Sequence, residues 1–215
     1  MKHNIDLLIF DLDGTLVDTR QDLTNAVNYA RKKLGLPPFE VAEVMQYVGE
    51  GARNLLERTL PPSHRDQLES ALDFFRQHYR EHLVDCSTLY PGVREILMHF
   101  QSKQMAVISN KPAEFARAIL AGLKVDKFFK LVLGGDSLPI MKPSPEPILH
   151  VLSELNVQPD RAVIIGDGTT DIQAGKQAGI LTCGVTYGFQ DRETLEIAQP
   201  DFLIDHILEL KNIFK

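Results

Sequence analysis

The chain has 215 residues, of which 44% are hydrophobic and 24% charged, and its formal net charge is −6. This length can bury a full core, and one domain with a smaller insert fits it better than two equal domains. The negative balance argues against a nucleic-acid partner, because phosphate-backbone binding needs a basic stripe and no Lys/Arg cluster is longer than Arg31-Lys32-Lys33. No apolar run approaches the roughly 20 residues of a membrane span, and Asp6 and Asp11 stand where a signal peptide would be uncharged. We therefore expect a cytoplasmic protein without a membrane partner.

The two cysteines, Cys86 and Cys183, lie far apart in the sequence and form no C-x-x-C pair. A redox or thiolate-metal role therefore has no support from spacing. We expect both to be reduced, packed thiols.

The first apolar run, residues 5–10, predicts a buried strand that ends in Asp11-Leu12-Asp13-Gly14-Thr15. Residues i and i+2 of an extended chain point the same way, so Asp11 and Asp13 can face one crevice. Gly14 permits a tight turn out of the strand. An acidic turn is the alternative interpretation of these residues alone. A calcium loop is excluded, because it would begin at Ile9 and end at Arg20, where Asp and Glu are required.

Residues 17–83 have the pattern of an all-helical insert, so that 1–16 and 84–215 would form the core domain. The first helix begins at the cap-like Asp18-Thr19 and ends before Gly35. Further helices are predicted over 40–47, 51–60 and 64–83, and Pro61-Pro62 separates the last two. The apolar faces of the first and last helices contain Leu23, Ala26, Val27, Ala30 and Leu34, and Leu68, Ala71, Leu72, Phe75, Tyr79 and Leu83.

After Tyr90-Pro91-Gly92, helices alternate with short apolar strands, which predicts a doubly wound, mostly parallel α/β sheet covered on both faces. Residues 5–10 would join this sheet. The expected strands are 105–108, 131–133, 162–165, 182–185 and 202–204. The expected helices are 92–101, 112–122, 145–156, 170–178, 191–198 and 205–213.

Polar residues follow three of the later strands, as they follow the first. They are Ser109-Asn110-Lys111, Lys142-Pro143 and Gly166-Asp167-Gly168-Thr169-Thr170-Asp171. Each group alone has an ordinary structural explanation: Asp167 or Asp171 as a helix N-cap, Lys142 as a solvated cation, Ser109 as a hydroxyl bonded to backbone. Together, in this order and spacing, they resemble the four motifs of haloacid dehalogenase-superfamily phosphotransferases along essentially the whole chain.

The resemblance implies a role for each matching residue. Asp11 would be the nucleophile that forms an aspartyl phosphate, and Asp13 the general acid and base. Mg²⁺ would be held by the carboxylates of Asp11 and Asp167 and by the backbone carbonyl of Asp13. Asp171 would act through a water molecule or by contacting the residues that bind the ion. Lys142 would supply positive charge and Ser109 a hydroxyl to the phosphoryl group, and amides near Leu12 and Asn110 would complete the cradle.

The fourth motif departs from the common pattern of the family. Gly168 stands where the family frequently has Ser, and Thr170 where Asn or another small polar residue is usual. Because both acidic positions are kept, we expect metal binding to persist. The departure bears mainly on the hydrogen-bond support around Asp167.

Within the superfamily, the chain is similar to bacterial phosphoglycolate phosphatases with a helical cap. The matching segments are 48–51, 55–58, 109–112, 134–136, 142–147 and 186–188. A cap would close over the crevice and exclude water. Gly49 and Gly51 would bring backbone close to the substrate at a helix N-terminus. Arg53 and Lys111 are candidate cations for the anionic tail of the substrate, and Asn110 is a further candidate contact.

The leading hypothesis is a Mg²⁺-dependent phosphatase for 2-phosphoglycolate or a similar small phosphorylated metabolite, as a monomer or homodimer. The alternatives are an inorganic pyrophosphatase, a sugar-phosphate mutase using the same nucleophile, and a non-catalytic binding protein on this fold. Kinase and dehydrogenase functions lack their glycine motifs.

His78 and His82 form an i, i+4 pair that could bind zinc. No third ligand is evident and the H-E-x-x-H pattern is absent. A surface or packing role is therefore the favoured interpretation.

Overall fold

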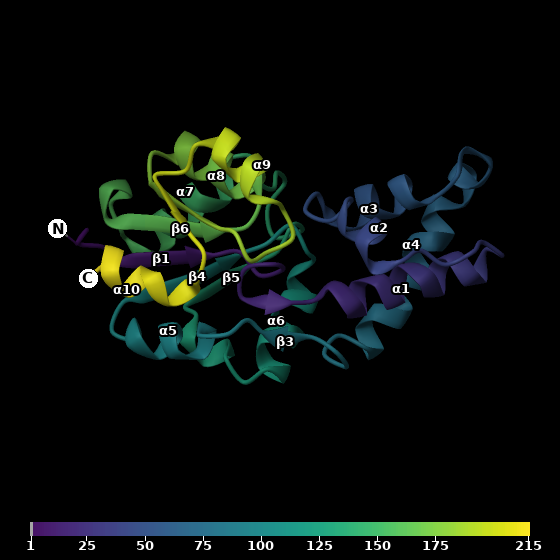
Figure 1. Cartoon of the computed structure of the whole chain (residues 1–215), viewed down its shortest axis with the longest axis horizontal. Coiled ribbons are helices and arrows are strands. Elements are labelled where there is room, and N and C mark those ends of the chain that lie inside the picture. The colour runs from purple at the N-terminus through teal and green to yellow at the C-terminus, as the bar shows by residue number, and fades with distance from the viewer. Residues whose placement is uncertain (1) are drawn as a thin grey trace. The chain divides into compact units, whose positions relative to one another are not determined.

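The computed structural model describes residues 2–215, and the chain divides into two compact units. The core unit comprises the chain up to Asp18 together with Leu89–Lys215, and the inserted unit is Thr19–Thr88 (Figure 1). No helix among the described residues is long and apolar enough to cross a membrane.

The core unit is built on a six-stranded parallel sheet with the strand order β5-β4-β1-β6-β7-β8. All four residues of β1 are buried, as expected for a strand covered on both faces. The order places β1 between β4 and β6, so the carboxyl ends of these three strands meet at one edge of the sheet. The strands are β1 (Leu7–Phe10), β4 (Gln104–Ile108), β5 (Leu131–Leu133), β6 (Ala162–Gly166), β7 (Leu181–Val185) and β8 (Phe202–Ile204).

Helices cover both faces of this sheet (Figure 1). On one face lie α7 (Glu146–Leu155), α8 (Thr169–Ala178) and α9 (Arg192–Ala198), and on the other α5 (Val93–His99), α6 (Ala113–Gly122) and α10 (Leu210–Ile213). Alternate strand residues such as Leu7 and Ile9 pack with Ile148 and Val151 of α7 in one buried cluster. The predicted doubly wound α/β fold is thus confirmed.

The inserted unit is helical, with α1 (Arg20–Lys33), α2 (Val41–Met45), α3 (Gly51–Thr59), the 3₁₀ helix η1 (Pro62–Gln67) and α4 (Leu68–Glu81). Helices α1 and α4 pack along each other. Their predicted apolar faces supply most of the core of this unit, including Val27 of α1 and Leu72, Phe75 and Tyr79 of α4.

Several local expectations were wrong. Residues 64–67 belong to a 3₁₀ helix that starts at Pro62, whose missing N–H suits a helix start. The helix expected over 205–213 is η4 (Ile207–Glu209) followed by α10. Cys86 is exposed, whereas Cys183 is buried as expected; both are free thiols.

The strands β2 (Val17–Asp18) and β3 (Thr88–Leu89), which form a separate sheet, are too short to show a periodicity. The remaining 3₁₀ turns are η2 (Asp126–Phe128) and η3 (Pro159–Arg161).

Asp22 of α1 joins the two ends of the inserted unit. Its buried carboxylate accepts hydrogen bonds from the backbone N–H groups of Cys86 and Ser87 and from the Ser87 hydroxyl, at 2.6–3.1 Å. Removing a charged acceptor would leave these donors, two of them on buried Ser87, without their partner.

We therefore expect Asp22→Ala to lower the free energy of unfolding by about 2–4 kcal/mol in urea denaturation. Asp73→Ala is the matched control, because Asp73 lies on α4 with 79% of its side chain exposed and only a 3.7 Å contact to Arg76. Its effect should stay within about 0.5 kcal/mol. Equal losses for the two variants would contradict this role of Asp22.

Candidate active site

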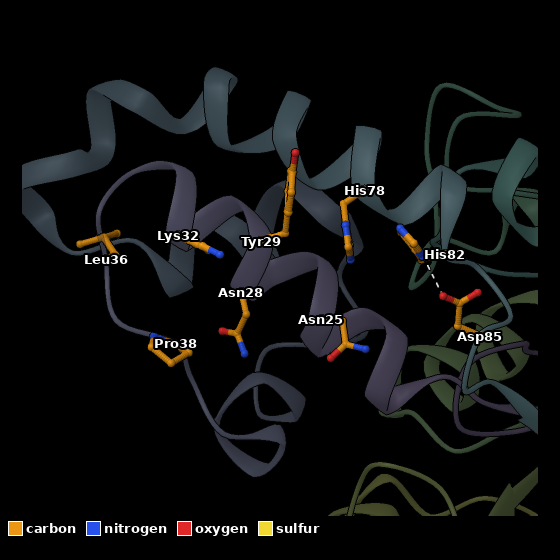
Figure 2. A pocket seen from close by; sticks show the side chains of 9 residues that line it. All are labelled: Asn25, Asn28, Tyr29, Lys32, Leu36, Pro38, His78, His82 and Asp85. Carbon is orange, nitrogen blue, oxygen red and sulfur yellow. Dashed lines mark hydrogen bonds and ion pairs between the residues drawn. The ribbon is translucent and has the colours of Figure 1, made fainter.

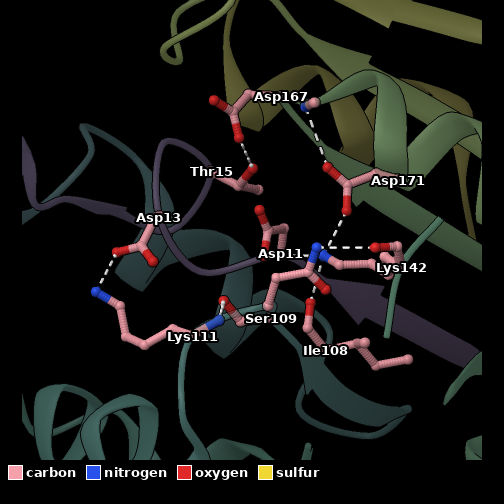
Figure 3. A network of polar contacts seen from close by, with 11 residues as sticks. Asp11, Asp13, Thr15, Ile108, Ser109, Lys111, Lys142, Asp167 and Asp171 are labelled. Carbon is pink, nitrogen blue, oxygen red and sulfur yellow. Dashed lines mark hydrogen bonds and ion pairs between the residues drawn. The ribbon is translucent and has the colours of Figure 1, made fainter. Parts of the chain in front are cut away.

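The predicted site residues of the core unit gather at the carboxyl edge of its sheet (Figure 3). Asp11 directly follows β1, Ser109 follows β4 and Asp167 follows β6. Since β1 lies between the other two strands, all three residues reach one edge. This edge is where ligands bind in open parallel sheets.

Lys142, from the loop after β5, lies between two carboxylates. Its Nζ is 3.0 Å from Asp11 Oδ1 and 2.5 Å from Asp171 Oδ1, and it donates a 2.6 Å hydrogen bond to the Ile108 carbonyl. The side chain is only 2% exposed, so the alternative of a solvated loop cation is wrong. Burial by itself lowers the pKa of Lys142, but Asp11 and Asp171 reverse this and raise it above its usual value. The ammonium therefore stays charged.

Asp171 has a structural contact as well as its contact to Lys142. It lies in the first turn of α8, where its Oδ2 accepts a 3.1 Å hydrogen bond from the N–H of Gly168, the N-cap residue. Both oxygens of Asp171 are thus engaged. Asp171 fixes the position of Lys142, which in turn contacts Asp11.

Asp167 is held by two donors that the sequence did not point to. The Thr15 hydroxyl donates to its Oδ1 at 3.0 Å, and the N–H of Phe189 donates to its Oδ2 at 2.7 Å. The hydroxyl absent at Gly168 is therefore not needed to hold Asp167. Thr15 belongs to the first motif and Phe189 directly follows the 186–188 match, but neither segment indicates a contact with Asp167.

Three glycines allow backbone to approach the acids closely. A Cβ at Gly14 or Gly188 would lie 2.1 or 2.2 Å from an atom of Asp167, and one at Gly166 would lie 2.2 Å from Asp171. Gly14 also has φ +80°, which disfavours other residues. Asp167 and Asp171 can occupy these positions only because glycine, which has no Cβ, stands at all three places.

Asp11, Asp167 and Asp171 form a group whose ligand oxygens all lie within 4.8 Å of one another. Burial is the main cause that raises the pKa of both Asp11 and Asp167 above the usual range, and repulsion from Asp171 adds to it in each case. Asp11 Oδ1 is buried and accepts no hydrogen bond of normal geometry, even with Lys142 nearby. Three carboxylates against one ammonium leave excess negative charge, and carboxylate oxygens suit a hard divalent cation. The residues present therefore fit a metal ion.

Asp13 lies outside this group, because its carboxylate turns to Lys111 (Figure 3). Lys111 Nζ is 2.9 Å from Asp13 Oδ1, and both side chains are largely buried. Ser109 Oγ accepts a 3.3 Å hydrogen bond from the Lys111 N–H, and Asn110 donates to the Lys142 carbonyl at 2.9 Å. Residues of the second motif therefore contact both Asp13, through Lys111, and the backbone of Lys142, through Asn110.

The expected substrate-binding residues of the helical insert lie in the inserted unit. Gly49 and Gly51 have φ values of +125° and +85°, and α3 begins at Gly51. Arg53 forms an ion pair with Glu69 at 2.7 Å, with both side chains more than half exposed. Arg53 therefore has a local partner at the surface of this unit.

Comparisons with known proteins agree with this geometry. The family model described as haloacid dehalogenase-like hydrolase matches residues 8–185. This chain belongs to the haloacid dehalogenase-like hydrolase family. It is 38% identical to a phosphoglycolate phosphatase of Chromobacterium violaceum, covering 100% of this chain and 98% of the relative, and 37% identical to one of Aquifex aeolicus, covering 95% and 94%. A crystal structure titled as a predicted phosphoglycolate phosphatase from Haemophilus somnus shares 31% identity with a TM-score of 0.89, covering 97% of each chain.

These findings confirm the resemblance drawn from the four motifs, and with it the prediction of a phosphatase. The residues matched by the family model include all four motifs, from Asp11 in the first, through Lys142 in the third, to Asp167 in the fourth. The helical insert falls within the matched residues as well. The acidic group of three residues gives the family fold a place for a divalent metal.

Gly188→Ala should displace Asp167 and weaken metal binding by at least roughly tenfold, a loss of the size seen when groups that orient metal ligands are removed. Titration with Mg²⁺, followed by calorimetry, measures this affinity. Gly168→Ala is the milder comparison, since a Cβ there meets its nearest atom, Asp171 Oδ2, at 3.1 Å, which a shift of a few tenths of an ångström relieves, and the φ of −110° suits alanine. Equal Mg²⁺ affinities for Gly188→Ala and Gly168→Ala would show that the close approach of Gly188 to Asp167 is not needed for metal binding.

Proposed function

We propose that this protein is a Mg²⁺-dependent phosphatase that hydrolyses 2-phosphoglycolate, or a closely similar short phosphate monoester, through an aspartyl phosphate on Asp11. The observation that carries the proposal is the position of Asp11 at the end of the central strand, 3.0 Å from Lys142 and grouped with Asp167 and Asp171. The choice of substrate is supported by full-length relatives named phosphoglycolate phosphatase.

The chemistry begins with Asp11. A carboxylate oxygen of Asp11 attacks phosphorus and the bond from phosphorus to the ester oxygen breaks, while Asp13 gives its proton to the leaving alkoxide. Asp13 then takes a proton from water, the water oxygen attacks phosphorus, and the bond to Asp11 breaks to release phosphate. Lys111 holds the Asp13 carboxylate beside the site at 2.9 Å.

Charge is the main obstacle, because an anionic phosphate must approach an anionic nucleophile. Lys142 offsets this with a buried ammonium whose position Asp171 fixes. Ser109 would donate its hydroxyl to a phosphoryl oxygen. Asp11, Asp167 and the carbonyl of Asp13 would hold Mg²⁺, which supplies Lewis-acid polarisation of the phosphoryl group when bound.

The inserted unit is proposed to serve as the cap that excludes water and selects the substrate. Gly49, Gly51 and Arg53 remain the candidate contacts in that unit for a carboxylate or second phosphate of the substrate. In the core unit, Lys111 is the candidate for the anionic tail, and the backbone amide near Asn110 for the phosphoryl group. Arg53 would exchange its exposed ion pair with Glu69 for the substrate, at little cost to stability.

Asp11→Asn should reduce phosphate release by at least roughly a thousandfold, because the amide is a poor nucleophile. The free energy of unfolding should not fall, since burial of its charge is the main cause of the raised pKa of Asp11, and a neutral amide carries no such desolvation cost. Steady-state assays and urea denaturation measure the two quantities. Turnover at the wild-type rate would reject Asp11 as the nucleophile, whereas an unfolded variant would reject the stability argument.

Phosphate release should be fastest with 2-phosphoglycolate in a panel that includes pyrophosphate, sugar phosphates and nucleoside monophosphates. Chelator should abolish release and Mg²⁺ restore it, because the acidic group needs a cation. Faster hydrolysis of pyrophosphate would favour the pyrophosphatase alternative. A long-lived phosphoenzyme with little release would favour a mutase.

We further propose that the protein is cytoplasmic and is a monomer or homodimer. It is proposed to have no nucleic-acid or membrane partner. The small phosphorylated metabolite it is proposed to use is consistent with this location. Cell fractionation and light scattering on the purified protein test these points.

A further inference from the structure

A hollow of about 520 Å³ lies within the inserted unit, between α1 and α4 (Figure 2). His78 and His82 of the α4 side line it together with Asp85, which follows the helix. The α1 side contributes Asn25, Asn28, Tyr29 and Lys32, and Leu36 and Pro38 complete the lining. All of these residues lie in one unit and none belongs to the acidic group of the core unit.

The two histidines lie side by side along α4. Their ring centroids are 4.3 Å apart with an interplanar angle of 32°. The ring nitrogen of His82 that does not contact Asp85 lies on the side facing His78 (Figure 2). A metal ion at roughly 2.0–2.1 Å from each of two imidazole nitrogens needs those nitrogens roughly 3 Å apart, so the rings must turn from their tilted arrangement to bind one.

Asp85 sets the tautomer of His82. Its Oδ2 lies 2.7 Å from His82 Nδ1, so the Nδ1–H donates to the carboxylate and the lone pair is on Nε2. A carboxylate behind an imidazole is the usual arrangement that orients a metal-binding histidine and raises its basicity. Asp85 thus orients His82 without being a third ligand.

His78 is held in place from the opposite side. Its ring stacks on Tyr29 at 4.6 Å with an angle of 14°. The exposed fraction of the His82 side chain, 41%, leaves room for water on the remaining coordination positions.

We propose that His78 and His82, with Asp85 behind His82, form a second metal site that binds borderline transition ions such as Cu²⁺, Ni²⁺ or Zn²⁺. Imidazole nitrogens select these ions, whereas the carboxylate oxygens of the core unit suit Mg²⁺. The site bridges the last turn of α4 and the segment that follows it. Metal binding there stabilises this end of the inserted unit.

The test titrates the full-length protein with Cu²⁺ in saturating Mg²⁺, which occupies the acidic site. We expect one bound Cu²⁺ whose electron paramagnetic resonance spectrum shows two coordinated nitrogens, with Ni²⁺ and Zn²⁺ binding more weakly than Cu²⁺. His82→Gln and His78→Gln should each lose one nitrogen signal and weaken Cu²⁺ binding more than tenfold. Asp85→Asn should weaken it roughly 10- to 100-fold and keep both nitrogens.

His64→Gln is the matched control, because His64 is a histidine of the same unit outside the hollow. Its Cu²⁺ affinity and spectrum should equal those of the wild type. Unchanged Cu²⁺ binding in both His78→Gln and His82→Gln, with circular dichroism showing folded variants, would overturn the proposal. His82 is partly exposed, so His82→Gln provides the test even if His78→Gln fails to fold.

Discussion

The site depends on one buried ammonium held between two carboxylates. Lys142 contacts Asp11, the proposed nucleophile, on one side and Asp171 on the other, and it is almost completely buried. In such surroundings an unpaired charge would be costly, so each member of the trio makes the burial of the others tolerable. Asp11 follows β1, Lys142 lies in the loop after β5 and Asp171 in the first turn of α8, so the charges pair only when these parts of the core unit have come together.

Three carboxylates share this network with one ammonium. Burial, followed by repulsion from neighbouring carboxylates, raises the pKa of both Asp11 and Asp167. A divalent cation would offset this repulsion and link metal binding to the order of the site. Backbone geometry supports that role, because Gly14 and Gly188 let two loops close directly on Asp167. Asp13 is kept apart by Lys111, which suits a proton-transfer residue that should not become a further side-chain ligand.

The two units of the chain offer donor sets of different chemistry. Carboxylates at the sheet edge suit a hard ion and phosphate chemistry, whereas the imidazoles of His78 and His82 suit transition ions. Each set is contained within a single unit. The affinity of one site for its ion can therefore be changed by substitution without touching the other.

The sequence by itself determined the fold class, the strands that make the sheet and the strand ends that carry Asp11, Lys142 and Asp167, because periodicity and spacing are local properties that survive in any context. Tertiary structure decided the partners. Thr15 and Asp167 are 152 residues apart, and their hydrogen bond exists only because β1 and β6 are neighbours and the turn at Gly14 is tight. Likewise, Asp22 meets Ser87, and His78 stacks on Tyr29, through the packing of α1 with α4. Local sequence preferences cannot predict contacts between residues so far apart in the chain, because the packing of whole helices and strands brings them together.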